Sequence, residues 1–252
     1  MFTDLLFDNN NNLYFCGYIS ADTIDLNYSL FNKDIQKSGL PLGFIGRYSS
    51  ENVLEKFIWI GGDQSDYLNG ILLDTNNNIH IFGDSNSTSI TFDNVNYVNP
   101  NPNIVPVENF VLNSLITKYN LDIPITPPTP PPLPIKLRAI NLLWLDGSGD
   151  DSINQTAIDS NGYIYYVGSS TSSSVEIGSQ TFIKPEGSTY NYGLFFCKID
   201  PITQTVIWIK WVDTSKNEFG YNITITKNDN IIISGQTNSA SIIIDSVTYT
   251  KY

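Results

Sequence analysis

The residues whose types and spacing could support chemistry are short clusters of carboxylates and amides. Asp74, Asn76 and Asn78 stand at alternate positions, as at the opening of a calcium-binding loop. Such a loop also needs a later carboxylate that binds the ion through both oxygens, and no acidic residue recurs at a consistent later position. We therefore interpret these residues as a tight turn, in which polar side chains hydrogen-bond to their own backbone.

Two acidic pairs and one histidine are the other candidates for acid–base or metal chemistry. Asp63 with Asp66, and Asp150 with Asp151, stand in glycine-containing links where we expect solvated carboxylates. His80 is the only histidine and lies within an apolar run, so we expect a hydrogen-bonded interior residue. A single histidine excludes a recurring Ser–His–Asp arrangement and a multi-histidine metal centre. The sequence accordingly predicts no catalytic, cofactor-binding or metal-binding residues.

Composition and charge restrict the partners of the chain. The 252 residues carry a formal net charge of -12. A surface that binds the phosphate backbone of a nucleic acid needs clustered Lys and Arg. No apolar stretch approaches the roughly 20 residues of a membrane-spanning helix. The N-terminal residues Met1 to Asp4 show neither the basic region nor the apolar core of a signal peptide. We therefore expect no nucleic-acid partner and no membrane insertion.

The elements that position these residues form a repeat. Four segments align without gaps from a polar turn to a glycine: 8–17, 74–83, 159–168 and 226–235. Six residues after each glycine a second set of segments begins at Ser or Thr, carries apolar residues two apart and ends on an aromatic residue: 23–31, 89–97, 174–182 and 241–249. A fixed spacing kept four times indicates one structural unit used repeatedly.

Each unit is expected to form four short antiparallel strands with the Ser/Thr-initiated hairpin between the second and the third. The third strand carries a basic residue, which we expect to pack its stem on the sheet and to pair with an acid: Arg47, Lys118 and Lys198. The fourth strand carries a tryptophan that we expect to anchor the core: Trp59, Trp144 and Trp208. Cys16 and Cys197 fall in different units and are expected to be small buried hydrophobes rather than a disulfide.

Four strands in each unit without a helix signal predict an all-β fold, a β-propeller of four-stranded antiparallel blades. The expected blades are residues 1–62, 63–147, 148–213 and 214–252, the last of them incomplete, so that about three and a half blades form an open ring. Exposed edges are the expected consequence, and further blades or a second chain are expected to cover them. Residues 123–134 are a proline-rich insert in the second blade, expected as an extended surface loop, with binding to an aromatic groove as the alternative.

At these residues the chain resembles the seven-bladed propeller repeats of bacterial surface proteins. The resemblance is carried by Asp66 through Gly83, Ser148 through Gly168, Leu115 through Tyr119 and the three tryptophans, while Thr226 departs from the aspartate of the pattern. Residues 200–208 also resemble the tryptophan-docking motif of quinone-cofactor propellers, but the accompanying metal-site residues are not evident, so no cofactor is expected. The abundance of Asn and Ile is typical of AT-rich genomes, such as those of giant viruses or some bacteria.

The resemblance implies a non-enzymatic structural or binding protein at a cell or virion surface. It would engage a protein or glycan partner through loops of the blades, or pair with further blades or copies of itself. One alternative is a carbohydrate-active propeller enzyme whose catalytic residues lie in missing blades, and another is an intracellular scaffold. Propellers host many unrelated roles, so the fold by itself does not choose among them.

Overall fold

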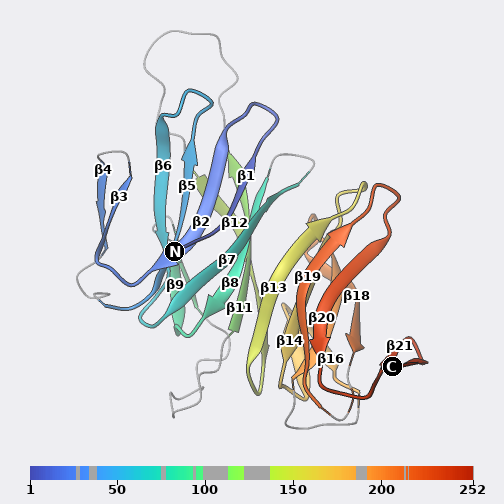
Figure 1. Cartoon of the computed structure of the whole chain (residues 1–252). Coiled ribbons are helices and arrows are strands. Elements are labelled where there is room, and N and C mark those ends of the chain that lie inside the picture. The colour runs from blue at the N-terminus through green and yellow to red at the C-terminus, as the bar shows by residue number, and fades with distance from the viewer. Residues whose placement is uncertain are drawn as a thin grey trace. The chain divides into compact units, whose positions relative to one another are not determined.

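The computed structural model describes the chain apart from residues 27–28, 34–38, 75–77, 93–94, 99–112, 122–136, 186–191, 213, 215 and 252, and apart from the side chains of 113–121 and 137–142. Its described regular elements are β-strands, paired antiparallel (Figure 1). The proline-rich segment 123–134 and Asn76 lie outside the described residues, as does the side chain of Lys118.

The strands recur in the order that the repeat predicts. The first repeat contains β1 (Phe2–Phe7), β2 (Leu13–Ile19), β3 (Thr23–Leu26), β4 (Ser29–Asn32), β5 (Leu42–Tyr48) and β6 (Leu54–Ile60). The second contains β7 (Asp66–Leu73), β8 (Ile79–Ser85), β9 (Ser89–Phe92), β10 (Val95–Val98), β11 (Asn113–Leu121) and β12 (Leu137–Gly147). The third contains β13 (Asp151–Ile158), β14 (Ile164–Ser170), β15 (Ser174–Ile177), β16 (Gln180–Ile183), β17 (Gly193–Asp200) and β18 (Thr205–Val212). The fourth contains β19 (Glu218–Ile225), β20 (Ile231–Thr237), β21 (Ser241–Ile244) and β22 (Val247–Thr250).

Each complete repeat forms a four-stranded sheet with a hairpin inserted between its second and third strands. The orders are β1-β2-β5-β6 in the first repeat and β13-β14-β17-β18 in the third, and β7, β8, β11 and β12 are neighbours in the same way. The hairpin strands β3, β9, β15 and β21 begin at the Ser and Thr residues that the sequence marks. The prediction of antiparallel four-stranded units with a separate hairpin is therefore confirmed.

Two compact units divide the chain: Met1–Phe82 with Ser87–Asn99 and Thr117–Leu142, and Gly83–Asn86 with Pro100–Ile116 and Leu143–Tyr252. In the first unit β7 packs on β1 and β2, and Leu68 of β7 lies against Gly43 of β5. In the second unit β19 packs on β13 and β14. Within each unit, therefore, the first strand of one repeat covers the first two strands of the repeat before it.

Apolar side chains on both faces of the second strands explain this packing, because such a strand must be covered on each side. One buried apolar cluster of the second unit contains Tyr165, Val167, Leu194, Phe196, Val212 and Ile223. Trp208 of β18 packs against this core and Trp144 of β12 is buried, as expected for core anchors. Trp59 is half-buried, and its indole N–H donates to the carbonyl of Asn32, 3.0 Å away.

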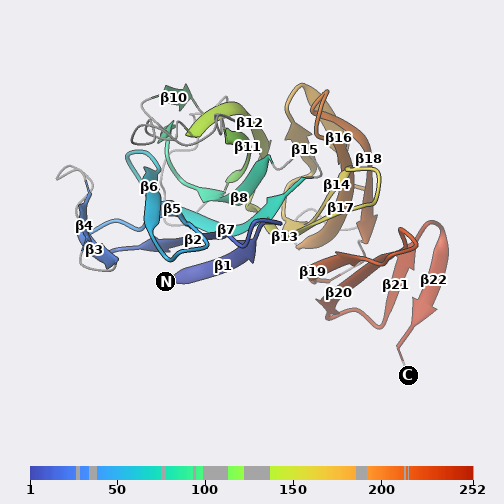
Figure 2. The ribbon, with the colours of Figure 1, turned by 90° about the horizontal axis from the view of Figure 1, so that it is seen from above.

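The hairpins connect consecutive repeats. In the first unit β9 meets the end of β6 through a bridge between Gly61 and Thr91. In the second unit β15 pairs with the last three residues of β12, with Leu145 opposite Ile177. The fourth hairpin, at the end of the chain in Figure 2, contacts β18, where Lys210 and Asp245 form an ion pair of 2.5 Å. Each of these hairpins thus contacts the fourth strand of the preceding repeat.

The two cysteines are free and buried, as expected. Burial raises the pKa of both Cys16 and Cys197 to about 12, so almost no thiolate is present at neutral pH.

We expect neither thiol to react with an aromatic disulfide reagent in the native protein and both to react after unfolding. A colorimetric thiol titration with and without denaturant measures this. Rapid release of chromophore from the native protein would contradict the buried placement.

Candidate functional site

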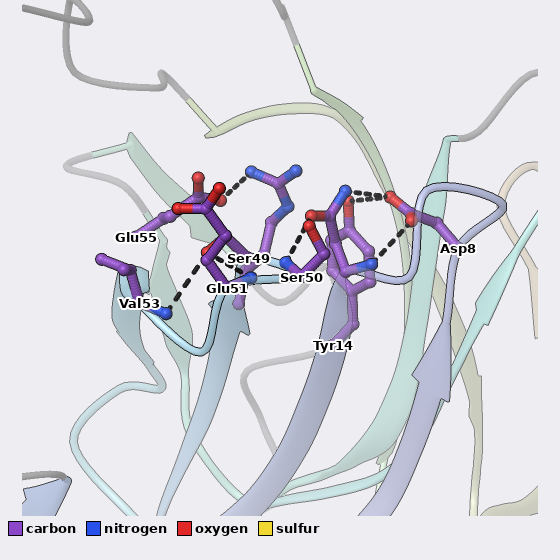
Figure 3. Close-up of polar contacts among 9 residues, drawn as sticks. Asp8, Tyr14, Ser49, Ser50, Glu51, Val53 and Glu55 are labelled. Atoms are coloured by element: carbon purple, nitrogen blue, oxygen red, sulfur yellow. Dashed lines mark hydrogen bonds and ion pairs between the residues drawn. The ribbon is translucent and has the colours of Figure 1, made fainter.

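The turn between β1 and β2 contains the first of two recurring polar clusters, which we call the turn cluster (Figure 3). One oxygen of the Asp8 carboxylate accepts the backbone N–H groups of Asn10 and Asn12, at 2.8 and 2.9 Å. The other accepts the Asn12 side-chain amide at 2.8 Å and the Tyr14 hydroxyl at 3.3 Å. Burial opposes ionisation of Asp8, but these hydrogen bonds outweigh it and its pKa lies below 3.8. The carboxylate is fully occupied in closing its own turn.

The neighbouring turn between β5 and β6 is tied to the same cluster (Figure 3). The backbone N–H of Ser50 donates to the Asn12 side-chain oxygen, 3.1 Å away. The Arg47 guanidinium lies 5.5 Å from the centre of the Tyr14 ring and pairs with the Glu55 carboxylate. The predicted role of the third-strand basic residue is confirmed here, because its stem packs on the sheet and its charge meets an acid.

The third repeat has the same cluster with lysine in place of arginine. The Asp159 carboxylate accepts the backbone N–H of Tyr163, the hydroxyl of Tyr165 and the Lys198 ammonium, each at 2.9 Å. The ammonium lies 4.1 Å from the centre of the Tyr163 ring and 4.9 Å from that of Tyr165. Burial opposes the charge of Asp159, but the Lys198 hydrogen bond and its companions hold the pKa of that carboxyl below 3.8.

In the second repeat the cluster contains the only histidine. His80 is buried, and its Nε2 lies 3.2 Å from the Asp74 carboxylate. The same carboxylate accepts both the backbone and the side-chain N–H of Asn78, at 2.8 and 2.7 Å. The expected interior, hydrogen-bonded histidine is confirmed, and the observed bonds of Asp74 are those of a turn.

The second recurring cluster, which we call the acid–hydroxyl cluster, begins at the first residue of the first strand. Asp151 is fully buried and accepts hydrogen bonds from the hydroxyls of Ser170 and Ser172. The Ser172 hydroxyl in turn accepts the backbone N–H of Gly149 at 2.9 Å. Burial raises the pKa of Asp151 to about 7, and the charge of Asp146 adds to this, although both serine hydrogen bonds oppose it.

Equivalent acids stand in the second and fourth repeats. Asp66 accepts the backbone N–H of Gly62 at 2.7 Å and the Ser87 hydroxyl at 3.0 Å. Glu218 accepts the hydroxyls of Ser239 and Thr237 through one oxygen, at 2.7 and 3.1 Å. These hydrogen bonds connect the first strand to the second strand or to the segment that leads from it to the hairpin, and at Asp66 also to the preceding link.

Our expectation that the acids of the links are solvated was wrong for Asp66 and Asp151. Both begin a strand and are buried, at 3% and 0% exposure. Hydroxyls of the second strand, or of the segment just after it, donate hydrogen bonds to them. The signal in the sequence is a hydroxyl residue two and four positions after the repeat glycine, as in Ser170 and Ser172. The first repeat has Ile19 and Ala21 at those positions.

An apolar hollow of about 460 Å³ lies on the first sheet, lined by Phe2, Leu5, Phe15 and Tyr48 among others. Its one carboxylate, Asp4, accepts the backbone N–H groups of Leu5 and Ile71, at 2.8 and 3.1 Å. A small-molecule site normally offers polar groups that orient its ligand. The carboxylate of this hollow is engaged by the backbone of the chain itself.

Within the described part of the chain no three metal-binding side chains gather as a metal site would require. The same residues contain no helix able to cross a membrane. The protein is all-β, and its antiparallel sheets repeat the same order of strands. Buried acidic side chains hydrogen-bond to neighbouring strands and turns and hold them together. No protein-family model matches the chain, and no curated protein matches it significantly. The resemblance to seven-bladed propeller repeats stays a prediction.

Proposed function

We propose that the chain forms about three and a half blades of a β-propeller, a non-enzymatic structural or binding protein at a cell or virion surface. The strand order β1-β2-β5-β6 and the packing of β7 on β1 and β2 support the propeller part of the proposal. The recurring acids support a structural use of the polar residues, since their observed hydrogen bonds close turns and fasten strands.

The observation that carries the binding role is the exposed apolar surface of the hairpins. Each hairpin presents on its second strand a large apolar side chain that is more than half exposed: Leu30, Val98, Ile183 and Val247. An exposed apolar side chain on every hairpin is the support for a contact of each hairpin with a partner, because apolar surface that a partner covers is removed from water. The partner is a protein or glycan bound through these hairpins.

The experiment compares two sets of substitutions in binding to a glycan array and to surface proteins of the source. The hairpin variant replaces Leu30, Val98, Ile183 and Val247 by Ser. The control variant replaces Val53 and Ile202, which are exposed at turns between the third and fourth strands. We expect the wild type and the control to retain the same ligand and the hairpin variant to lose it. Absence of any retained ligand, or equal retention by both variants, would overturn the binding role.

The surface location has a separate test. Antibodies against the chain should label intact cells or virions of the source. Labelling that requires permeabilisation would contradict surface display and support the intracellular alternative.

A further inference from the structure

The hairpin β15–β16 of the third repeat begins at the acid–hydroxyl cluster around Asp151. Ser170 is the last residue of β14 and Ser172 stands two residues before β15, and the hydroxyls of both donate to the Asp151 carboxyl group. The backbone N–H of Ser172 donates to the Ser170 hydroxyl at 3.0 Å. Asp151 and both serines are at 0% exposure. A single buried carboxyl group therefore holds the segment through which the chain enters the hairpin.

The same carboxyl group lies beside the strand pair that seats the hairpin. β15 pairs with the last three residues of β12, and Gly147 at the end of β12 stands opposite Val175. A Cβ on Gly147 would lie 2.7 Å from a carboxylate oxygen of Asp151 and 2.2 Å from the Ser172 hydroxyl oxygen, so the cluster touches this strand pair. A displacement of Asp151 therefore disturbs both the entry to the hairpin and its pairing with β12.

Other acidic residues surround Asp151 and disfavour its ionised form. Asp146 of β12 is at 4% exposure and Asp150 precedes Asp151 in the chain, and the charges of both add to the effect of burial in raising the pKa of Asp151. Glu176 of β15 stands opposite Asp146 in the strand pair. Ionisation of Asp151 thus adds a negative charge to a junction that already contains these acids.

Two donor side chains also adjoin the cluster. The Tyr192 hydroxyl donates to the Asp150 carboxylate at 2.9 Å, and burial together with this bond raises the pKa of Tyr192 to about 12, so the hydroxyl keeps its proton. The Lys184 ammonium donates to the Ser170 carbonyl at 3.5 Å, and the Lys184 backbone N–H donates to the Ser173 carbonyl at 2.9 Å. Lys184, the residue after β16, therefore connects the end of the hairpin to the segment at which it begins.

Opening of the hairpin base gives water access to Asp151 and changes the pH at which it ionises. Burial holds the pKa of Asp151 at about 7 in the closed protein, against 3.8 for the exposed group. Below pH 3.8 the carboxyl is protonated in both forms, so pH does not affect the opening. Between pH 3.8 and 7 the open form loses a proton that the closed form keeps, which favours opening by up to about tenfold per pH unit. Above pH 7 both forms are ionised and the effect is complete.

We propose that the acid–hydroxyl cluster of the third repeat is a proton-controlled fastening of the hairpin β15–β16, closed in acid and increasingly open toward neutral pH. The hairpin presents Ile183, which is 80% exposed and is one of the side chains assigned above to partner binding. The fastening therefore regulates that binding surface, and in this consequence it rests on the proposed function. Opening of the hairpin does not itself depend on a partner.

The first repeat supplies an internal control because it lacks these hydroxyls. Ile19 and Ala21 stand where the third repeat has its two serines. The hairpin β3–β4 is closed at its base by the same backbone bond, from the N–H of Lys33 to the carbonyl of Asp22 at 2.8 Å. We therefore expect opening of this hairpin to be insensitive to pH.

Hydrogen–deuterium exchange of the whole chain at pH 5, 6, 7 and 8, corrected for the intrinsic exchange rate at each pH, measures the opening. We expect the protection of β15 and β16 to fall at least about tenfold from pH 5 to pH 7 and to level off by pH 8, while that of β3 and β4 stays constant. Protection of β17, an inner strand of the third sheet, should exceed that of β15 at each pH, which separates local opening from global unfolding. Equal protection of β15 and β17 throughout, or the same fall in both hairpins, would overturn the proposal.

Two variants separate the proton from a merely structural role of the cluster. In Asp151→Asn the protection of β15 should be the same at each pH, even where the variant is less stable, because the amide has no proton to lose. Ser172→Ala removes a hydrogen bond that lowers the pKa of Asp151, so the fall should continue from pH 7 to pH 8, whereas the exposed neighbour Ser173→Ala should keep the wild-type profile. A fall retained in Asp151→Asn, or identical profiles for the two serine variants, would contradict the proposal. Exchange is measured without a ligand, so failure of the hairpins to retain any partner would overturn the proposed function alone.

Discussion

Replacing Asp151 by Asn is expected to abolish a large part of the pH dependence of stability between pH 4 and pH 8. In the folded protein burial raises the pKa of this carboxyl from 3.8 to about 7. Below pH 3.8 the carboxyl of Asp151 is protonated in both the folded and the unfolded state, so its contribution to the free energy of unfolding is fully present. As the pH rises toward 7 the folded protein keeps a proton that the unfolded chain has lost, so the free energy of unfolding falls. The expected fall is on the order of a few kcal/mol.

Urea unfolding of the wild type and of Asp151→Asn at pH 5, 6, 7 and 8 measures this contribution. The difference in unfolding free energy should shift in favour of the variant as the pH rises, because the amide has no proton to lose. Asp245→Asn is the matched control, since the Asp245 side chain is 61% exposed. We expect the difference in unfolding free energy between Asp245→Asn and the wild type to be the same at each pH. A constant difference between Asp151→Asn and the wild type from pH 5 to 8 would refute the raised pKa.

Replacing Asp159 by Thr, the residue of the fourth repeat, is expected to lower the free energy of unfolding by about 3 kcal/mol or more. The carboxylate is the hydrogen-bond acceptor for Tyr165 and for the Lys198 ammonium, and both side chains remain largely buried without it. Leaving the partly buried Lys198 ammonium without its acid costs more than the net contribution of the pair. Chemical unfolding at pH 7 measures the loss.

The fourth repeat also provides the control for this prediction. There Thr226 closes the turn by accepting the backbone N–H of Asn230 at 3.1 Å, and Ile232 replaces the tyrosine. Adding Tyr165→Ile and Lys198→Met to Asp159→Thr should therefore recover roughly half of the loss, because no buried polar group is left without a partner. A triple variant no more stable than Asp159→Thr alone would show that the turn, and not the ion pair, carries the energy.

The repeat made much of the fold predictable from the sequence. Alternating apolar residues and polar turns are local signals, so the hairpins beginning at Ser89 and Ser174 were placed correctly. The basic residue of the third strand was also assigned correctly where its side chain is described, at Arg47 and Lys198. A charged residue inside an apolar strand needs a nearby partner, which is Glu55 of β6 for Arg47 and the turn acid Asp159 for Lys198.

The acid–hydroxyl cluster was not predicted, for a reason visible in its pairing. Asp151 stands beside glycines and another acid, which locally resembles a solvated turn. Its burial depends on Ser170, which is distant in the sequence but stands directly opposite it in the antiparallel pair β13 and β14. Glu218 and Thr237 are opposite each other in the same way. A hydrogen bond between residues that face each other across a sheet is hard to recognise in a single sequence, because the two residues lie far apart in the chain.

The sequence by itself determined the repeat, the strand order within a repeat and the turns, because each depends on residues close together in the chain. The tertiary structure decided which carboxylates are buried and that Asp151 holds its proton up to about neutral pH. These properties arise from burial and strand pairing, which depend on segments that only the folded chain brings together.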